Sequence, residues 1–137
     1  MNRDLIIKEA QKWTNTPFKF KGKTIKGCDC GGLIYGVIYN INSKHKFLDY
    51  FEAYGNNFIV IEEIINKNLE NLNLKSISAS IGDVLLFKLD KNYFHFGIML
   101  QENKFIHACV TKNKVILTDF SKFWQNRLLL NICIDNL

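Results

Sequence analysis

Apolar residues recur at helical spacing in the N-terminal half of the chain and alternate with polar residues in the C-terminal half. The first half predicts helices over residues 3–13 and 30–41. The inward face of the first helix is predicted to consist of Leu5, Ile6, Ala10 and Trp13. The apolar face of the second helix consists of Leu33, Ile34, Val37 and Ile38. Both helices are therefore expected to bury one side against the rest of the protein.

The middle of the chain combines aromatic and amphipathic segments. Residues 46–55 carry several aromatic side chains and predict a helical or irregular segment that walls a cleft. After Asn56 and Asn57, which can cap a helix, a further amphipathic helix is predicted. Its apolar face would consist of Phe58, Ile61, Ile64, Ile65 and Leu69. Residues 76–80 have the composition of a linker.

The C-terminal half has the alternation typical of strands. The predicted strands cover residues 83–89, 94–101, 104–110, 114–118 and 128–134, and residues 119–126 form a connection that contains Trp124. Helices followed by a run of antiparallel strands indicate an α+β fold. A length of 137 residues and a hydrophobic content of 47% are typical of one globular domain spanning residues 1–137.

The chain is basic, with a net charge of +5 and a pI near 9.0. Lys19, Lys21, Lys23 and Lys26 form a cluster that either attracts an anionic polymer or is simply solvated. Nucleic-acid binding is not expected, because the basic residues are otherwise scattered and no nucleic-acid motif is visible. No apolar run reaches the roughly 20 residues that span a bilayer, so no membrane insertion is expected. Residues 1–9 do not have the pattern of a secretory signal, which predicts synthesis in the cytoplasm.

Residues 28–36 carry the strongest chemical signal. Cys30 falls in the first turn of the second predicted helix, where unpaired N–H groups and the helix dipole favour a thiolate or an oxyanion. We therefore expect the pKa of the Cys30 thiol to lie well below its usual value of about 8.5. Gly31 and Gly32 each cost about 1 kcal/mol of helix propensity relative to alanine. Their presence indicates that something approaches the backbone closely, and a substrate chain is one candidate.

A nucleophilic thiol needs a base, and the chain has three histidines. His45 lies among polar residues and is expected to be a solvated loop residue. His95 and His107 lie on two predicted strands joined by a polar turn over residues 101–104. If paired positions sum to about 205, His95 lies nearly opposite residue 110 and His107 is diagonal to it. This register allows both imidazoles onto one face of the sheet, depending on the turn.

The four cysteines do not indicate a disulfide framework. A zinc site made by Cys28, Cys30, His95 and His107 is possible but less favoured, because the Cys-x-Cys spacing is tighter than that of usual zinc motifs. Cys133 is expected to be a buried apolar residue. Cys28 is a spare thiol near Cys30, although a disulfide between these two positions would be strained.

Four motifs in order resemble the NlpC-type cell-wall cysteine peptidases, most closely their phage-type branch. The motifs are Asp29–Leu33, Ile81–Phe87, His95–Leu100 and Phe105–Ala108, and the upstream stretch Trp13–Gly22 is also similar to a family segment. The resemblance runs from about Lys8 to about Val110. It implies a papain-like fold in which the nucleophile helix packs on an antiparallel sheet of about five strands that carries both histidines.

The resemblance also implies roles for individual residues. Cys30 would be the nucleophile, His95 the general base and His107 the group that orients His95, with a thioester intermediate and no cofactor or metal. The backbone N–H of Cys30 would stabilise the oxyanion. The implied substrate is the stem peptide of peptidoglycan, cut between D-glutamate and a diamino acid, with the muramoyl–alanine amide as the second choice.

Two departures from the family pattern concern substrate binding. Phe18 stands where the family usually has a tyrosine, and Gly31 replaces a serine that, together with the preceding aspartate, recognises a free amine. Asp29 is retained and is expected to pair with that amine. These departures leave open an idle family member that serves as a phage-tail or particle-assembly component. A lipid acyltransferase on the same scaffold is a third alternative. Without a signal peptide, a wall enzyme would reach its substrate by lysis or through a particle.

Overall fold

The computed structural model describes residues 2–49, 51, 72–75, 79–91 and 93–137. The first elements are α1 (Asn2–Gln11), β1 (Lys23–Thr24), β2 (Gly27–Cys28) and α2 (Cys30–Ile41). They are followed by β3 (Leu72–Lys75), β4 (Val84–Asp90), β5 (Tyr93–Gln101), β6 (Lys104–Cys109), β7 (Lys114–Asp119), α5 (Lys122–Gln125) and β8 (Leu128–Ile134). The α+β prediction is confirmed, and the second helix has the predicted bounds.

Helix α2 begins at an aspartate cap and ends at an asparagine cap. The Oδ1 atom of Asp29 accepts a hydrogen bond from the N–H of Gly32 at 2.8 Å, which satisfies one of the unpaired donors of the first turn. At the other end, the N–H of Asn42 donates to the carbonyl oxygen of Ile38 at 2.8 Å. The predicted apolar face is buried in the core. The helix therefore holds Cys30, its first residue, in a fixed position.

Within the described residues, the larger sheet contains six strands in the order β3-β8-β4-β5-β6-β7, and every neighbouring pair is antiparallel. Five of these strands were predicted from the sequence within one or two residues. The sixth strand, β3, was not predicted, and it pairs with β8 through contacts such as Leu72 opposite Ile134. Such a pairing joins segments far apart in the sequence, so local alternation does not reveal it.

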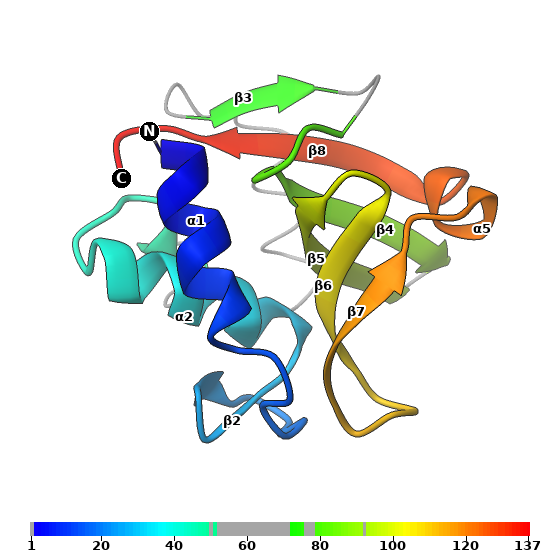
Figure 1. Ribbon diagram of the computed structural model, residues 1–137, viewed down its shortest axis with the longest axis horizontal. Helices are drawn as coiled ribbons and strands as arrows, with labels where there is room; N and C mark the ends of the chain where they lie inside the picture. The colour runs from blue at the N-terminus through cyan, green and yellow to red at the C-terminus, as the bar shows by residue number, and fades with distance from the viewer. Residues whose placement is uncertain (1, 50, 52–71, 76–78, 92) are drawn as a thin grey trace.

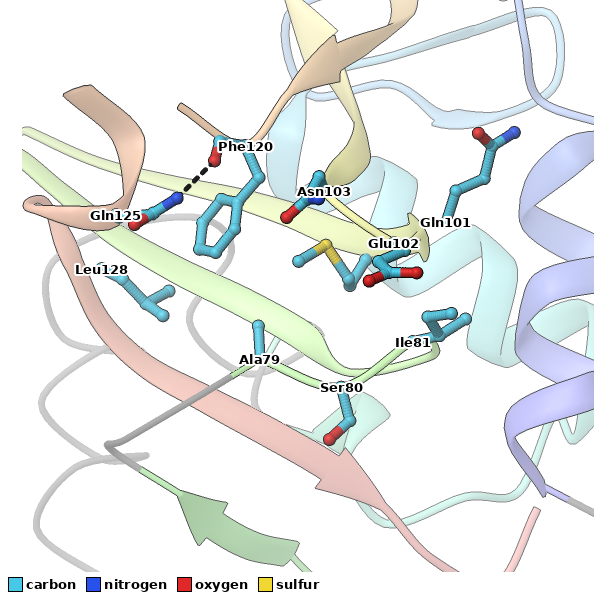
Figure 2. A pocket seen from close by; sticks show the side chains of 10 residues that line it. Ala79, Ser80, Ile81, Gln101, Glu102, Asn103, Phe120, Gln125 and Leu128 are labelled. Atoms are coloured by element: carbon cyan, nitrogen blue, oxygen red, sulfur yellow. Dashed lines mark hydrogen bonds between the residues drawn. The ribbon is translucent and has the colours of Figure 1, made fainter. Parts of the chain in front are cut away.

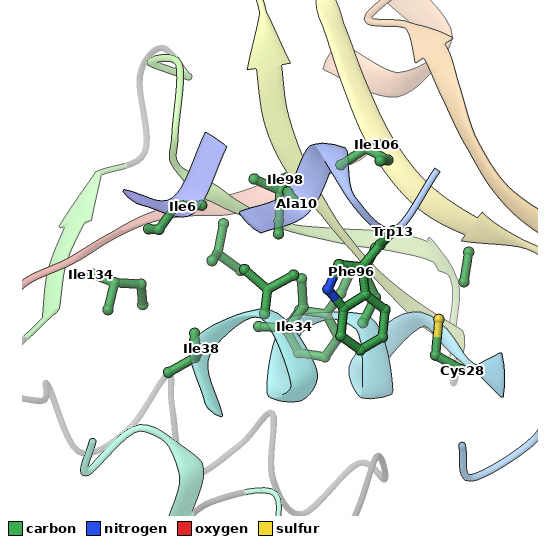
Figure 3. Close-up of a cluster of buried hydrophobic side chains, with 14 of the residues drawn as sticks. Ile6, Ala10, Trp13, Cys28, Ile34, Ile38, Phe96, Ile98, Ile106 and Ile134 are labelled. Atoms are coloured by element: carbon green, nitrogen blue, oxygen red, sulfur yellow. The ribbon is translucent and has the colours of Figure 1, made fainter. Parts of the chain in front are cut away.

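Alternating residues of the sheet form two apolar clusters on its two faces. Helices α1 and α2 lie against one face, as Figure 1 shows. This larger cluster includes Val84, Leu86, Phe96, Ile98 and Ile106 together with the buried faces of both helices, several of which are labelled in Figure 3. The opposite face carries a smaller cluster of Leu85, Phe87, Met99 and Phe105, packed against Trp124 and Phe120.

The two helices approach closely because α2 has a glycine where they cross. A Cβ atom at Gly36 would lie 2.1 Å from the ring of Trp13, so only glycine leaves room for the buried indole. Ile6 and Ala10 are buried on the same side of α1. The prediction that Leu5 faces inward is wrong, because this side chain is 44% exposed. With 3.6 residues per turn, Leu5 falls off the stripe that Ile6, Ala10 and Trp13 share.

A buried aspartate at the start of β4 ties α1 to the sheet. Asp83 is fully buried and pairs with the guanidinium of Arg3 at 2.8 Å. It also accepts hydrogen bonds from the N–H of Ser80 at 2.9 Å and from Asn131 at 3.0 Å. Gly82, with φ of +92°, makes the turn that delivers the chain to this position. Gly82 and Asp83 therefore have a structural role, because they hold α1 against the sheet.

The segment 15–28, which contains the lysine cluster and whose residues 16–28 were predicted to be a basic loop, forms an ordered ribbon beside the sheet. The N–H groups of Asn15 and Phe18 donate to the carbonyl oxygens of Val115 and Asn113, each at 3.0 Å. Cys28 in turn donates its N–H to the carbonyl oxygen of Pro17 at 3.0 Å. The segment around Pro17 thus lies between the edge strand β7 and the β1–β2 hairpin and is hydrogen-bonded to both.

Parts of the middle of the chain can be compared with the sequence predictions. Within the aromatic segment over 46–55, Phe47, Leu48 and Phe51 are buried in the larger cluster. The amphipathic helix predicted after Asn56 and most of the linker-like stretch lie outside the described residues. In the part of the chain that is described, no helix has the length and apolar character needed to cross a membrane.

His45 is buried rather than solvated, so that prediction is wrong. Its side chain is enclosed near the C-terminus, with residue exposure of only 5%. The Nδ1 atom accepts the N–H of Phe47 at 3.1 Å, and Nε2 lies 2.6 Å from the carbonyl oxygen of Asp135. These contacts assign the proton to Nε2, which donates to Asp135. His45 joins the segment after α2 to the end of the chain.

Candidate active site

Cys30 lies at the N-terminus of α2, directly against strand β5. The backbone N–H of Phe96 points at the Cys30 sulfur, and the N–H groups of Gly31 and Cys30 itself also face it. His95 is the residue immediately before Phe96, so the fold brings the thiol next to the strand position of that histidine. The residue as a whole remains partly exposed.

The thiol is more weakly acidic than the sequence indicates. Burial raises the pKa of Cys30 to about 11, and the negative charge of Asp29 adds to this effect. The surrounding N–H groups lower the pKa but do not offset the loss of hydration. The expectation of a thiolate at neutral pH is therefore wrong for the unliganded site. The position at a helix N-terminus favours the thiolate, but enclosure of the sulfur between a helix and a sheet costs the thiolate its hydration.

His95 and His107 form a directly hydrogen-bonded pair. Their side chains extend from β5 and β6 onto the same face, and Nε2 of His95 lies 2.7 Å from Nδ1 of His107. The two rings are nearly perpendicular, at 89°. A bulge between Met99 and Gln101 changes the predicted register by one, and the pairing that brings both imidazoles to one face is retained.

Thr118 continues this chain of contacts and was missed in the sequence. Its Oγ1 atom lies 2.8 Å from Nε2 of His107. On β7, Ile116 is opposite His107, so strand alternation places Thr118 on the same face and diagonal to the imidazole. The register of the β6–β7 hairpin was therefore the signal that would have identified it.

The hydrogen-bond chain has one proton arrangement in which His95 can act as a base toward Cys30. With Nε2 of His95 directed at His107, Nδ1 is the nitrogen available to accept a proton. Nε2 must then carry a hydrogen and donate to Nδ1 of His107. His107 in turn must donate from Nε2 to the Thr118 hydroxyl oxygen. Thr118 as an acceptor thus selects the tautomer that leaves His95 basic at the correct atom.

Both imidazoles are held neutral by burial. Loss of hydration, together with a smaller effect of the neighbouring His107, lowers the pKa of His95 to about 3. Burial alone lowers the pKa of His107 to about 4. The aromatic rings around them account for this environment, since Trp124 lies 5.7 Å from His95 and 5.4 Å from His107 between ring centroids. The resting site therefore contains a thiol and neutral imidazoles.

Asp29 and the glycines after Cys30 have structural uses that the sequence did not indicate. Asp29 is buried, with Oδ1 accepting from Gly32 and Oδ2 accepting from the N–H of Lys21 at 2.9 Å. Its carboxylate therefore joins the β1–β2 ribbon to the helix. A Cβ atom at Gly32 would lie 1.7 Å from the carbonyl oxygen of Gly22, so the close approach expected there is made by the protein's own loop.

The remaining sequence candidates lie in the ribbon before α2, in the first turn of α2 and in the hydrophobic core. Phe18 is half-buried, packs against the larger cluster and bridges Cys28. Gly31 is buried in the first turn of α2. Cys28 is fully buried in the hydrophobic core (Figure 3), and Cys133 is half-buried and accepts a hydrogen bond from Arg3. Among the described residues, no group of three or more His, Cys, Asp or Glu side chains is placed to hold a metal ion.

A hollow of about 420 Å³ lies at the opposite end of β5 from His95. Figure 2 shows its lining, which combines Phe120 and Leu128 with the polar side chains of Gln101, Glu102 and Gln125. Gln125 donates to the carbonyl oxygen of Phe120 at 2.7 Å. Neither Cys30 nor the two histidines contribute to this hollow, so it is separate from the candidate active site.

A cysteine at a helix N-terminus beside a histidine pair on the adjoining sheet defines the papain-like class of cysteine hydrolase architectures. The chain belongs to the NlpC/P60 family, whose model matches residues 15–132. This match covers every element of the site, from the ribbon before Cys30 through Thr118.

The chain is similar to several endopeptidases, two of which have names that refer to murein or peptidoglycan. The chain is 23% identical to murein DD-endopeptidase MepS/murein LD-carboxypeptidase of Escherichia coli (strain K12), over 89% of this chain and 57% of that protein. It is 24% identical to a probable endopeptidase of Haemophilus influenzae, over 90% of this chain and 72% of the relative. It is 29% identical to the probable peptidoglycan endopeptidase LytE of Bacillus subtilis (strain 168), over 79% of this chain and 28% of the relative. The chain thus spans little more than half of the E. coli relative and a smaller part of LytE.

Solved structures show the same fold. The NlpC/p60 domain of the peptidoglycan hydrolase SagA superposes with a TM-score of 0.68 at 21% identity, covering 98% of this chain and all of that one. NlpC2 from Trichomonas vaginalis superposes with a TM-score of 0.65 at 16% identity, covering 96% of this chain and 46% of that one. At these identities the likeness concerns the fold.

Proposed function

We propose that the chain is a cysteine peptidase or amidase that hydrolyses amide bonds in peptidoglycan stem peptides. The observation that carries the proposal is the hydrogen-bonded chain from His95 through His107 to Thr118, next to the thiol of Cys30. Membership of the NlpC/P60 family supports the substrate class, since two of the relatives above are named as a murein endopeptidase and a probable peptidoglycan endopeptidase.

In the proposed reaction, the thiol and the base act together. As the Cys30 sulfur attacks the amide carbonyl carbon, Nδ1 of His95 accepts the thiol proton, because neither group is ionised beforehand. The tetrahedral oxyanion is stabilised by the backbone N–H of Cys30 at the start of α2. His95 then donates the proton to the leaving amine nitrogen, the C–N bond breaks and a thioester remains.

Water completes the cycle. His95, neutral again, takes a proton from a water molecule whose oxygen attacks the thioester carbonyl carbon. The C–S bond breaks, the carboxylic acid product leaves, and the proton returns to the Cys30 sulfur. Throughout both halves, His107 accepts the hydrogen bond from Nε2 of His95 and so stabilises the imidazolium that forms transiently.

We further propose that the bond cut is the one between D-glutamate and the diamino acid. The family resemblance of the motifs around Cys30, His95 and His107 supports this choice. The two carboxylate oxygens of Asp29 accept hydrogen bonds from the N–H groups of Lys21 and Gly32. Pairing of this carboxylate with a substrate amine stays a prediction, since a carboxylate oxygen can accept more than one hydrogen bond.

Mass spectrometry of purified muropeptides incubated with the wild type tests the proposal. We expect two fragments that correspond to hydrolysis after D-glutamate, and loss of both with Cys30→Ala. Cys28→Ser is the matched control, since Cys28 lies in the core two residues away, and its activity should follow its folded fraction. Release of intact stem peptides would instead indicate cleavage of the muramoyl–alanine amide. No cleavage by folded wild type would contradict the enzyme and favour an assembly role.

A further inference from the structure

A basic surface lies beside the candidate active site, at the end of the molecule where two distant segments meet. The first segment, residues 14–28, contains four lysines and no acidic residue, and the β6–β7 turn adds Lys112 and Lys114. Backbone hydrogen bonds from Phe18 to Asn113 and from Asn15 to Val115 hold the two segments together. Figure 1 shows both at the lower edge of the molecule.

The lysines of this surface are exposed and have no acidic partners. Five of them are Lys19, Lys21, Lys26, Lys112 and Lys114. We call these five lysines, together with Phe20, Ile25 and Val110, the basic end. None of the five ammonium groups forms an ion pair within the part of the chain that the structure describes. Two ammonium groups also lie over aromatic rings: that of Lys21 is 5.8 Å from the ring centroid of Phe20, and that of Lys23 is 4.5 Å from the ring centroid of Tyr35. The positive charge of the basic end is thus directed at solvent.

The basic end also carries three of the four most exposed large apolar side chains among the described residues. Phe20 is 75% exposed, Val110 59% and Ile25 53%. Ile25 and Lys26 form the two-residue tip of the β1–β2 hairpin, and Phe20 precedes Lys21 in the same ribbon. Exposed aromatic and aliphatic groups are unfavourable in water unless they meet an apolar partner. A purely anionic polymer would give the lysines a partner but not these three side chains.

From this combination we infer that the basic end docks on the headgroup surface of an anionic lipid bilayer. Lysines attract the acidic headgroups, and Phe20, Ile25 and Val110 reach the boundary between headgroups and acyl chains. The contact is interfacial and needs no membrane-spanning segment. It does not depend on the proposed hydrolase activity.

Docking at this end would fix the orientation of the site. The N–H of Lys21 donates to Asp29, and the carbonyl oxygen of Gly22 lies against Gly32 in the first turn of α2. The basic end is therefore attached to the helix terminus that bears Cys30. A protein bound in this way would present its thiol close to the bilayer surface.

Co-sedimentation with lipid vesicles tests the inference. The probes are vesicles of phosphatidylglycerol mixed with phosphatidylcholine, and vesicles of phosphatidylcholine alone. We expect binding to the first and not to the second, with an affinity that falls as salt is added. Changing Lys19, Lys21 and Lys26 together to alanine should weaken binding about a hundredfold, at about fivefold per lysine.

Apolar variants separate a bilayer from other anionic partners. Phe20→Ser with Ile25→Ser should weaken vesicle binding at least tenfold while its salt dependence remains. The controls are Lys44→Ala with Lys46→Ala, at the far end of α2, and Leu5→Ser on α1, which is exposed outside the basic end. Both controls should bind like the wild type, and circular dichroism checks that every variant is folded.

Two results would overturn the inference. One is failure of the folded wild type to bind anionic vesicles at low salt. The other is binding that is insensitive to the Phe20 and Ile25 changes and is matched by soluble polyphosphate, which would identify the basic end as a site for anionic polymers. Hydrolysis is not measured, and Cys30→Ala should bind vesicles like the wild type.

Discussion

The role assigned to Thr118 gives the most direct test of the hydrogen-bond chain. Thr118→Val replaces the hydroxyl with a methyl group of similar size, so the packing of β7 is retained while Nε2 of His107 loses its acceptor. His107 can then adopt the tautomer that carries its hydrogen on Nδ1, which donates to Nε2 of His95. In that arrangement the proton of His95 moves to Nδ1, the atom that has to receive the proton of Cys30.

The size of the effect follows from the lost hydrogen bond, whose length is 2.8 Å. Such a bond contributes about 1 kcal/mol net, which is about a fivefold change in the balance between tautomers. We therefore expect kcat to fall about fivefold and KM to remain unchanged, because Thr118 is separated from the thiol by two imidazoles. The unpaired N–H of His107 should also lower the midpoint of thermal unfolding by about 3–5 °C.

Steady-state hydrolysis of a defined muropeptide measures kcat and KM, and nitrogen NMR shifts of labelled histidine report the tautomers. Thr118→Ser restores the hydroxyl and should recover most of kcat, whereas Thr14→Val, at the end of α1, should leave kcat unchanged. Unaltered kcat in folded Thr118→Val would refute the tautomer argument. Equal loss in Thr118→Ser and Thr118→Val would show that the methyl packing matters and the acceptor does not.

Three further outcomes are expected. The rate of Cys30 alkylation should keep rising with pH beyond about 8.5, because burial raises its pKa to about 11, and a plateau below that pH would contradict the neutral thiol. His95 and His107 have pKa values of about 3 and about 4 in the folded protein, below the ordinary 6.5. Between pH 4 and pH 6.5 the unfolded chain therefore binds more protons than the folded protein. The free energy of unfolding, measured in urea, should therefore decrease as pH falls from 6.5 to 4, with a smaller slope in His107→Gln; equal slopes would refute this. Gly32→Ala should prevent stable folding or strongly lower the midpoint of thermal unfolding, because its Cβ would meet the carbonyl oxygen of Gly22 at 1.7 Å. An unfolding midpoint equal to that of the wild type would show instead that the β1–β2 ribbon moves to make room.

Local pattern was sufficient for the elements that carry the candidate catalytic residues. The apolar face of α2 and the aspartate before it predicted a helix that begins at Cys30, and the structure has the same bounds. Alternation along β5 and β6, with a polar turn between them, predicted the hairpin that pairs His95 with His107. These features depend on neighbours in the sequence, so they are visible without tertiary structure.

The features that were missed depend on contacts between distant segments. The β1–β2 ribbon consists of strands two residues long, which are stabilised by the segment around Pro17 and by β7. The buried role of His45 needs the carbonyl oxygen of Asp135, which lies 90 residues further along the chain. No local pattern contains such partners.

The acidity of the thiol was misjudged for the same reason. Helix position alone favours a thiolate at Cys30, whereas enclosure against β5 removes water from the sulfur and raises the pKa. Similarly, the acid at Asp29 resembles a substrate-binding group in sequence, and only the fold shows Lys21 and Gly32 occupying its oxygens. Solvation and hydrogen-bond partners of this kind are not specified by a sequence.

The aromatic surroundings of the histidine pair supply a built-in optical probe. The chain contains two tryptophans, and Trp13 is buried against Gly36, away from the imidazoles. Trp124 stacks near both rings, and a cationic imidazole at such range quenches indole emission. Trp13→Phe would leave a single fluorophore whose brightness follows the charge of the pair, so its titration could be read without a label.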